Sequence, residues 1–441
     1  MPLPNPTSHT SITDVTVIDV EAGLAIPAQT VKIAGAQIER IALPAGPEVP
    51  ERTRSIDGHG LYLMPGLVDA HVHYLDAPVF GRLMLANGVL LVRDMGMPNE
   101  FILPLRDALN RGEILGPEMV TTGAILDGEP PLIPLISLGI ATPEAGHLAV
   151  RRQAELGVNL IKVYSRLERE VFLAIVDEAR RCGLKAVGHI PESVSLEQAV
   201  AAGLASSEHF FGFEKALGSL LGEPVNYTFA GMGSQAGFLQ RLSEVKPQDL
   251  EEMFRWVGAS GMAVCPTVIT FKIATQIKAF QAGNYPRQEF ISSMVMGIWA
   301  SMWAQQDNLP VFIWQNWVEM VKGLHQAGVP LMVGTDLMLP GVFPGFAVHE
   351  EMALWQQAGI PAADVLRSAT FIPAQFVGLG NRLGSVREGK TASLLLLRAN
   401  PLEDVRNAQR IEGVFLRGQY FNRNDLDRML EEARQAAQPP V

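Results

Sequence analysis

The sequence predicts an α/β protein built on a (β/α)8 TIM barrel, joined to a small β-sandwich domain that the two ends of the chain form together. Two observations support this fold class. Short apolar runs alternate with helical stretches through the middle of the chain, which is typical of βα units around a parallel sheet. Segments rich in β-forming residues and separated by Gly and Pro occur only towards the two ends.

Eight candidate strands lie in the middle of the chain. They occupy residues 61–70, 89–96, 118–126, 160–165, 185–190, 206–211, 262–268 and 330–336. Eight units over about 320 residues fit a (β/α)8 barrel with insertions. A doubly wound sheet is the alternative, but that fold usually has a Gly-rich phosphate loop, and none follows the first strand.

The β-rich segments at the two ends are expected to pair with each other. TDVTVIDV and TVKIAGAQIERIA occur near the N-terminus, and KTASLLLL and IEGVFLRGQYF occur near the C-terminus. We therefore expect residues 1–64 and 385–441 to form the small β domain, and residues 65–384 to form the barrel.

A helical insertion is expected at about residues 271–326, because this stretch is too long for one connection in a barrel. It contains four of the six Trp residues of the chain. Met296, Trp299 and Trp303 follow one another at helical spacing. This stripe either packs on the barrel or forms an apolar wall over an active site, which loops after barrel strands build.

Composition narrows the class of protein. The chain has 441 residues and a net charge of -11, which disfavours nucleic acid and anionic membranes as partners because both are polyanionic. We expect a small-molecule substrate and a cytoplasmic protein that forms either a monomer or a homo-oligomer. The opening residues lack a secretory signal pattern, and the apolar runs are too short for a membrane helix. Cys182 and Cys265 are interpreted as buried apolar residues, with zinc ligation as the alternative.

Potential metal ligands end several of the predicted strands. His71 and His73 end the first strand, and residues i and i+2 of a strand face the same way. Two imidazoles would therefore point together at the catalytic face of the barrel. Four later strands end in further groups of this kind: Lys162, His189, His209 and Asp336. Together the six side chains predict a metal site.

These residues resemble the amidohydrolase superfamily, in particular its binuclear branch of imidazolonepropionase-like and prolidase-like enzymes. The resemblance extends to MPGLVDAHVH, to VRDMG after the second strand, and to LGSVREGK and NPLEDV near the end. It implies two divalent metal ions, with zinc as the first expectation and manganese, cobalt or iron as alternatives.

By this resemblance, His71 and His73 bind the more buried metal together with Asp336. His189 and His209 bind the second metal. Lys162, carboxylated by carbon dioxide, bridges the two. A carbamate suits this position because an ammonium group facing two dications would be repelled.

The implied chemistry is hydrolysis of a C–N bond, in an amide, peptide-like or urea-like linkage of a small and partly apolar molecule. A hydroxide that bridges the metals attacks the carbonyl carbon. Asp336 is the candidate catalytic residue, as a general base and then a general acid. A prolidase-like dipeptidase or carboxypeptidase, a lactone or ester hydrolase, a mononuclear deaminase and a catalytically silent scaffold remain as alternatives.

The deaminase alternative rests on the sequence His189-Ile-Pro-Glu192, because a His-x-x-Glu motif supplies a proton-shuttling Glu in that branch. We expect Glu192 to favour the positive end of the helix that follows, and Lys162 indicates the binuclear branch.

Four further residues carry expectations of their own. Tyr164 lies two residues beyond Lys162 and is a candidate for substrate binding, with a packed aromatic ring as the alternative. Arg93 and Asp94 end a strand and are expected to form a structural ion pair. His349 is expected to open a helix.

Overall fold

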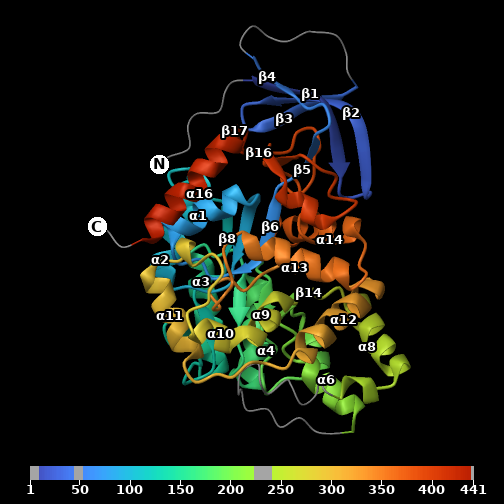
Figure 1. Ribbon diagram of the computed structural model, residues 1–441. Coiled ribbons are helices and arrows are strands. Elements are labelled where there is room, and N and C mark those ends of the chain that lie inside the picture. Colours follow the sequence, from blue (N-terminus) through green and yellow to red (C-terminus); the bar gives the residue numbers. More distant parts are fainter. Residues whose placement is uncertain (1–8, 44–52, 223–240, 439–441) are drawn as a thin grey trace.

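A computed structural model describes residues 9–43, 53–222 and 241–438 of the chain, and all structural statements below refer to these residues (Figure 1). The start of the predicted N-terminal segment and the last three residues lie outside them. Strands cluster in two places, one at the top of Figure 1 and one in its centre.

Strands from the two ends of the chain share one mixed sheet of eight strands, in the order β17-β16-β15-β5-β1-β2-β3 with β4 parallel to β1. This pairing of the termini agrees with the sequence prediction, but the strands form one sheet where a two-sheet sandwich was expected. The strands are β1 (His9–Asp19), β2 (Leu24–Ala34), β3 (Gln37–Ala42), β4 (Thr53–Asp57), β5 (Tyr62–Pro65), β15 (Leu394–Leu397), β16 (Ile411–Leu416) and β17 (Gln419–Asn422).

Parallel strands in the middle of the chain form two further sheets, one of three strands (β6-β7-β8) and one of six (β10-β9-β11-β12-β13-β14). The strands are β6 (Leu67–Val72), β7 (Val89–Asp94), β8 (Glu118–Thr121), β9 (Ile125–Asp127), β10 (Ser137–Gly139), β11 (Ile161–Val163), β12 (Ala186–Gly188), β13 (Ser206–Glu208) and β14 (Ala263–Cys265).

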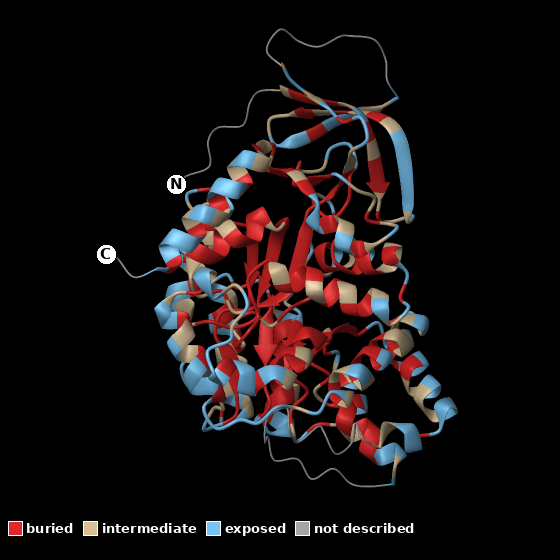
Figure 2. Cartoon of the chain, in the orientation of Figure 1, coloured by how far each residue is buried: buried red, intermediate tan, exposed pale blue. Residues whose placement is uncertain are grey.

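Helices follow most of the parallel strands, as the alternating sequence pattern predicts. They are α1 (Ala77–Ala86), α2 (Asn99–Arg111), α3 (Pro143–Glu155), α4 (Arg169–Arg181), α5 (Leu196–Ala202), α6 (Phe213–Leu220), α8 (Pro247–Ser260), α9 (Val268–Ile273), α10 (Ile277–Gln281), α11 (Ser293–Trp303), α12 (Phe312–Gln326), α13 (Phe346–Gln357), α14 (Ala362–Ser368), α15 (Phe371–Phe376) and α16 (Arg423–Ala437). Short 3-10 helices occur at η2 (Leu242–Glu244), η3 (Ala274–Gln276), η4 (Gln288–Phe290) and η5 (Val405–Gln409). In Figure 2 the outer helices alternate between buried and exposed residues, whereas the central strands are buried throughout.

Two of the predicted strands are each divided between two sheets. The apolar run 61–70 becomes β5 and β6, which Gly66 separates, and a Cβ atom at Gly66 would lie 2.5 Å from the Leu90 side chain. The run 118–126 becomes β8 and β9, with Gly123 between them at a φ of +64°. β8 pairs with β7, and β9 pairs with β11, so this segment contributes to both parallel sheets.

The predicted last strand, residues 330–336, makes isolated bridges and not a regular ladder among the described residues. Val264 N of β14 donates to Pro330 O at 3.0 Å, and Ala70 N of β6 donates to Val333 O at 2.9 Å. Residues 330–337 thus hydrogen-bond to the first and the last parallel strand. A side chain interrupts the regular pattern, because the carboxylate of Asp69 accepts hydrogen bonds from both N and Oγ1 of Thr335.

The Trp-rich stretch forms several helices between β14 and residue 330, and α12 leads directly into the last predicted strand. Trp299 and Trp303 are buried, whereas Met296 is half-buried. The indole Nε1 of Trp299 donates to Met338 O at 2.9 Å. The stripe therefore packs on the body of the protein and ties α11 to the loop that follows Asp336.

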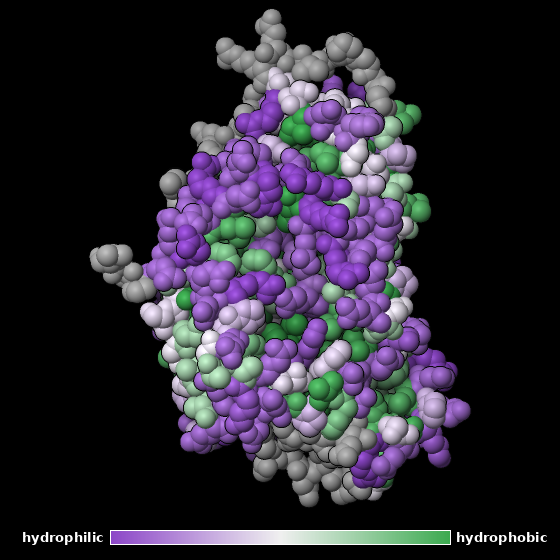
Figure 3. All heavy atoms as spheres, viewed as in Figure 1, coloured by the Kyte–Doolittle hydropathy of each residue, from purple (hydrophilic) through white to green (hydrophobic). Residues whose placement is uncertain are grey.

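The face seen in Figure 3 is largely hydrophilic, with hydrophobic residues in small separate groups. Among the described residues, no helix combines the length and the hydropathy that crossing a bilayer requires.

Candidate metal centre

The six residues predicted to bind metal lie at or just beyond the carboxyl ends of the parallel segments. This is the end at which barrel enzymes place their active sites. His71 and His73 come from the end of β6, Lys162 from β11, His189 and His209 from the positions after β12 and β13, and Asp336 from residues 330–337.

The carboxylate of Asp336 faces three imidazoles. Its Oδ1 lies 3.4 Å from Nε2 of His71 and 3.5 Å from Nε2 of His73, and its Oδ2 lies 3.7 Å from Nε2 of His209. These distances are longer than usual hydrogen bonds. Two ligands of one tetrahedral zinc ion lie about 3.4 Å apart, given metal–ligand distances of about 2.1 Å. The separations of His71 and His73 from Asp336 therefore fit three ligands that share one cation.

His189 lies beside this group. Its ring centre is 5.2 Å from that of His209, and the ring centres of His71 and His209 are 4.4 Å apart. Lys162 is buried, and its charge lowers the pKa of all four imidazoles. The structure thus brings the six predicted residues together.

Each of the four histidines has a hydrogen-bond partner at Nδ1, which leaves Nε2 available for a metal. The partners are Glu208 Oε2 for His71 (2.9 Å), Gly96 O for His73 (2.7 Å), Ser165 Oγ for His189 (2.9 Å) and Thr267 Oγ1 for His209 (2.7 Å). Metal-binding histidines typically have such partners, which fix the ring orientation.

Burial keeps the histidines neutral. Loss of solvent lowers the pKa of His73 to about 4 and holds the pKa values of His71, His189 and His209 well below the usual range, with the positive charge of Lys162 acting in the same direction. A neutral imidazole has a free lone pair, so all four rings can coordinate a metal at neutral pH.

Two buried atoms in this cluster, His71 Nε2 and Lys162 Nζ, have no hydrogen-bond partner. Unsatisfied buried polar atoms are rare because they cost free energy. Burial also lowers the pKa of Lys162 to about 8 and raises the pKa of Asp336 to about 7. A metal centre bound by these residues would satisfy both atoms, so the residues fit the group that the sequence predicts.

Glu208 was missed in the sequence although it lies next to His209. Its carboxylate is fully buried and accepts from His71 Nδ1, from Arg93 Nη2 at 2.8 Å and from Ser206 Oγ at 2.6 Å. Regular strand alternation would place either Glu208 or His209 inside, but not both. The φ of +56° at His209 breaks the alternation, so both side chains reach the interior.

The expectation of a structural ion pair between Arg93 and Asp94 is wrong, because Arg93 pairs with Glu208 at 2.8 Å. The guanidinium of Arg93 also donates to Ala70 O at 2.5 Å. Asp94 instead accepts hydrogen bonds from Tyr74 N at 2.9 Å and from a neighbouring threonine hydroxyl. Because strand alternation sends Arg93 and Asp94 in opposite directions, the two side chains have different partners.

Several residues of the centre have backbone conformations that side chains disfavour. His209, Thr267 and Asp336 have φ values of +56°, +47° and +55°. Such left-handed conformations cost about 1–3 kcal/mol each for non-glycine residues and are found mostly at functional sites. The β-branched Thr267 is the most unusual of the three.

Tyr164 lies at the centre, where it stacks on His189 with 4.1 Å between ring centres. Phe211 stacks on the opposite face of the same imidazole at 4.0 Å. Two aromatic rings therefore hold His189 between them. Tyr164 is buried and Phe211 is half-buried.

The expectation that Glu192 helps to begin the next helix is wrong. Ser195 caps α5, where its side chain accepts from Gln198 N in a reciprocal capping box. Glu192 lies in the turn before it, and its negative charge acts on Lys215.

His349 and Cys182 lie apart from the predicted ligand set, whereas Cys265 lies close to His71. His349 lies within the first turn of α13, and its Nε2 pairs with Asn87 O at 2.8 Å. Cys265 is buried in an apolar cluster, and burial holds the pKa of its thiol above the usual range, although the sulfur lies within 4.8 Å of ligand atoms of His71 and Glu208. Cys182 is half-buried at the end of α4.

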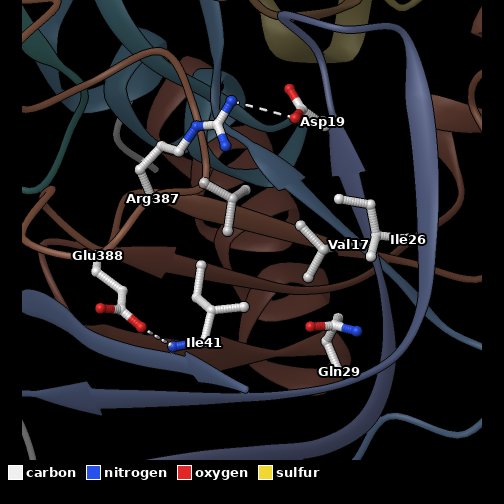
Figure 4. A pocket seen from close by; sticks show the side chains of 8 residues that line it. Val17, Asp19, Ile26, Gln29, Ile41, Arg387 and Glu388 are labelled. Atoms are coloured by element: carbon white, nitrogen blue, oxygen red, sulfur yellow. Dashed lines mark hydrogen bonds and ion pairs between the residues drawn. The ribbon is translucent and has the colours of Figure 1, made fainter. Parts of the chain in front are cut away.

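A pocket of about 380 Å³ lies elsewhere, in the sheet that the chain ends share (Figure 4). Val17, Ile26 and Ile41 line it, and Arg387 pairs with Asp19 at 3.1 Å at one side. No histidine or cysteine is among its lining residues, so this pocket lacks the donors of the metal centre.

Several known proteins are similar to this chain. Ochratoxinase from Aspergillus niger is 24% identical over 414 residues, which is 80% of this chain and 73% of the ochratoxinase. The structure of a bottromycin amidohydrolase aligns with a TM-score of 0.79 at 22% identity, over 98% of this chain and 91% of the other. A proposed prolidase from Bifidobacterium longum aligns with a TM-score of 0.67 at 24% identity, over 97% and 99% of the two chains.

At these identities the structural matches show a shared fold, a TIM barrel with an additional domain. The sequence pattern that defines the amidohydrolase family matches residues 62–420, a range that includes all six predicted ligands. This chain therefore belongs to the amidohydrolase family, which has prolidase-like members.

Proposed function

We propose that the protein is a binuclear metal-dependent hydrolase that cleaves an amide or related C–N bond in a small, partly apolar molecule. One observation carries this proposal: the carboxylate of Asp336 lies 3.4–3.7 Å from Nε2 atoms of three neutral histidines. His71 and His73 each direct an Nε2 lone pair at this carboxylate, and a shared cation would stabilise that arrangement. Membership of a family of amide hydrolases supports the reaction type.

The buried charges favour two divalent cations. Arg93 and Lys162 are the positive side chains at the centre, and the carboxylates are Asp69, Asp94, Glu208 and Asp336. If Lys162 carries a carbamate, five acidic groups and one guanidinium are buried in this region. Two dications would offset most of the negative charge of these groups. Burial of unbalanced charge is costly, so the excess of acidic groups supports the binuclear proposal.

Lys162 is proposed to bridge the two ions as a carbamate. Its buried Nζ has no hydrogen-bond partner, and burial favours the neutral amine. A neutral amine adds to carbon dioxide and releases one proton as the carbamate forms. The product supplies two anionic oxygens where the free side chain supplies none.

The metals, when bound, acidify a water and polarise the scissile carbonyl. Asp336 is proposed to accept a proton at its carboxylate and to return it to the leaving amine. Tyr164, stacked on His189, is proposed to contact the substrate. The aromatic rings of Tyr164 and Phe211 support an apolar group in that substrate, whereas the buried Trp stripe does not.

Other substrates with the same kind of carbonyl remain candidates. A prolidase-like dipeptide or a lactone would be attacked in the same way, since the pocket and not the metals selects among them. The deaminase alternative is weaker, because Glu192 lies beside Lys215 and α5 begins later.

Zinc is the first candidate for both ions. We also propose that residues 330–337 close the parallel strands into one barrel, and that the protein is cytoplasmic.

The test combines metal analysis with a substrate panel. Purified protein is assayed for bound zinc, manganese, cobalt and iron, and for turnover of N-acyl amino acids, aryl amides, dipeptides, phenylureas and lactones. We expect two metals per chain and activity on at least one amide. Lys162→Ala should lose both, while Lys278→Ala, which changes an exposed ion pair, should lose neither. Wild-type activity and two metals in Lys162→Ala would contradict the bridging role.

A further inference from the structure

The two halves of the proposed centre differ in the groups that hold their histidines. In the first half, Nδ1 of His71 faces the carboxylate of Glu208, and Nδ1 of His73 faces the carbonyl of Gly96. In the second half, Nδ1 of His189 and of His209 each face a hydroxyl group, from Ser165 and Thr267.

This difference decides which imidazole nitrogen carries the proton. A carboxylate or a carbonyl can only accept, so His71 and His73 must carry their proton on Nδ1. Their Nε2 lone pairs are then free for a metal. A hydroxyl can donate or accept, so His189 and His209 can carry the proton on either nitrogen. When it lies on Nε2, that ring cannot bind a metal through Nε2.

Glu208 is itself held firmly. Its Oε2 accepts from Arg93 Nη2 at 2.8 Å in addition to His71, and its Oε1 accepts from Ser206 Oγ at 2.6 Å. Three donors thus surround a fully buried carboxylate. A carboxylate partner also makes an imidazole a stronger ligand, and loss of such a partner typically weakens metal binding about 10- to 100-fold.

We infer that Glu208 is a positioning residue that makes the metal centre asymmetric: the His71–His73 half is preorganised and loads first, and the His189–His209 half loads second and more weakly. This inference rests on the proposed metal centre, but it concerns the order of loading and not the reaction.

The first test uses wild-type protein stripped of metal with a chelator. Zinc is titrated back and followed by calorimetry, and the histidine ring nitrogens are followed by ¹⁵N NMR. We expect two steps of unequal affinity, with the His71 and His73 signals changing at the first equivalent. Before zinc is added, these two rings should carry the proton on Nδ1, whereas His189 and His209 should show both tautomers.

Two variants assign the steps. Glu208→Gln keeps the shape of the side chain, but its amide can also donate a hydrogen bond. We therefore expect the zinc affinity of the first binding step to fall about 10- to 100-fold and that of the second step to stay nearly unchanged. Ser165→Ala is the matched control in the His189–His209 half, and it should change the zinc affinity of the second binding step alone.

Each outcome has a distinct meaning. Two equal steps, or a first step that involves His189 and His209, would overturn the inference while leaving a metal centre intact. Absence of zinc binding in the wild type would instead overturn the proposed function. If Glu208→Gln fails to fold because Arg93 loses its partner, the wild-type NMR titration and Ser165→Ala still decide between the two loading orders.

Discussion

The sheet shared by the chain ends and the centre at the parallel strands each have a buried interior, but the two interiors are built from opposite kinds of residue. The interior of the shared sheet is apolar, with Ile12, Val31 and Phe415 fully buried. The centre buries charged groups such as Lys162 and Glu208 to the same extent. Apolar burial stabilises a fold, whereas buried charge costs free energy unless it is paired. The comparison therefore separates a region that maintains the structure from one that performs chemistry.

The largest expected effect is on activity, at Asp336. Asp336→Asn keeps the shape of the side chain but removes its ability to accept a proton. We expect kcat to fall about 10²- to 10⁴-fold, with little change in thermal unfolding. Steady-state kinetics and calorimetry measure the two effects. Asp364→Asn, which changes a partly exposed partner of His325, is the control and should be near wild type in both. A large loss of stability with full activity would break the comparison.

The next effect is on stability, at Phe415 in the shared sheet. Its side chain is fully buried, so Phe415→Ala should lower the free energy of unfolding by about 3–5 kcal/mol. Activity at temperatures well below unfolding should stay near wild type. Urea unfolding and an assay at low temperature check this pair of results. Phe101→Ala, at a residue 38% exposed, should cost far less.

A smaller, mixed effect is expected at Trp299, which connects the insertion to the loop after Asp336. Trp299→Phe removes the partly buried hydrogen bond to Met338 O and should cost about 0.5–1.5 kcal/mol, the usual net contribution of one hydrogen bond. We expect a reduction of kcat of less than about tenfold, since the loop is loosened but no ligand is lost. Trp256→Phe, at a residue 38% exposed, serves as the control. Equal kinetics and stability in both variants would argue against a role of the insertion in holding this loop.

The smallest effect is expected at Arg398, which forms an ion pair with Glu412 on the surface of the shared sheet. The Arg398 side chain is 57% exposed and that of Glu412 is 31% exposed, and ion pairs in contact with solvent contribute less than about 1 kcal/mol. Arg398→Ala should therefore have almost unchanged unfolding and activity. A loss as large as that of Phe415→Ala would show that surface charge also maintains this sheet.

The sequence predicts the histidine, lysine and aspartate positions well, because each ends a recognisable apolar run. His71, Lys162 and Asp336 are found in this way, and the structure brings them together. Glu208 is not predicted, because regular alternation in β13 allows only one of Glu208 and His209 to face inward. Its role follows from a backbone conformation that hydrophobic patterning does not encode.

The fold shows a similar limit. The alternation of apolar and helical segments predicts the parallel strands, but a single apolar run does not reveal where one sheet ends and another begins. Gly66 and Gly123 mark these changes, and a lone glycine within a strand is too common a signal to predict them. The irregular pairing of residues 330–337 depends on a distant carboxylate, Asp69, which no local pattern can indicate.

The left-handed backbone at His209, Thr267 and Asp336 affects how this protein would respond to selection. Glycine or asparagine adopts this conformation more readily than histidine, threonine or aspartate. If a library of variants is screened only for survival after heating, the screen would therefore select variants in which these residues are replaced, because such variants are more stable. The most heat-resistant clones would be enriched in proteins without a working centre, so a useful screen must require turnover in every round.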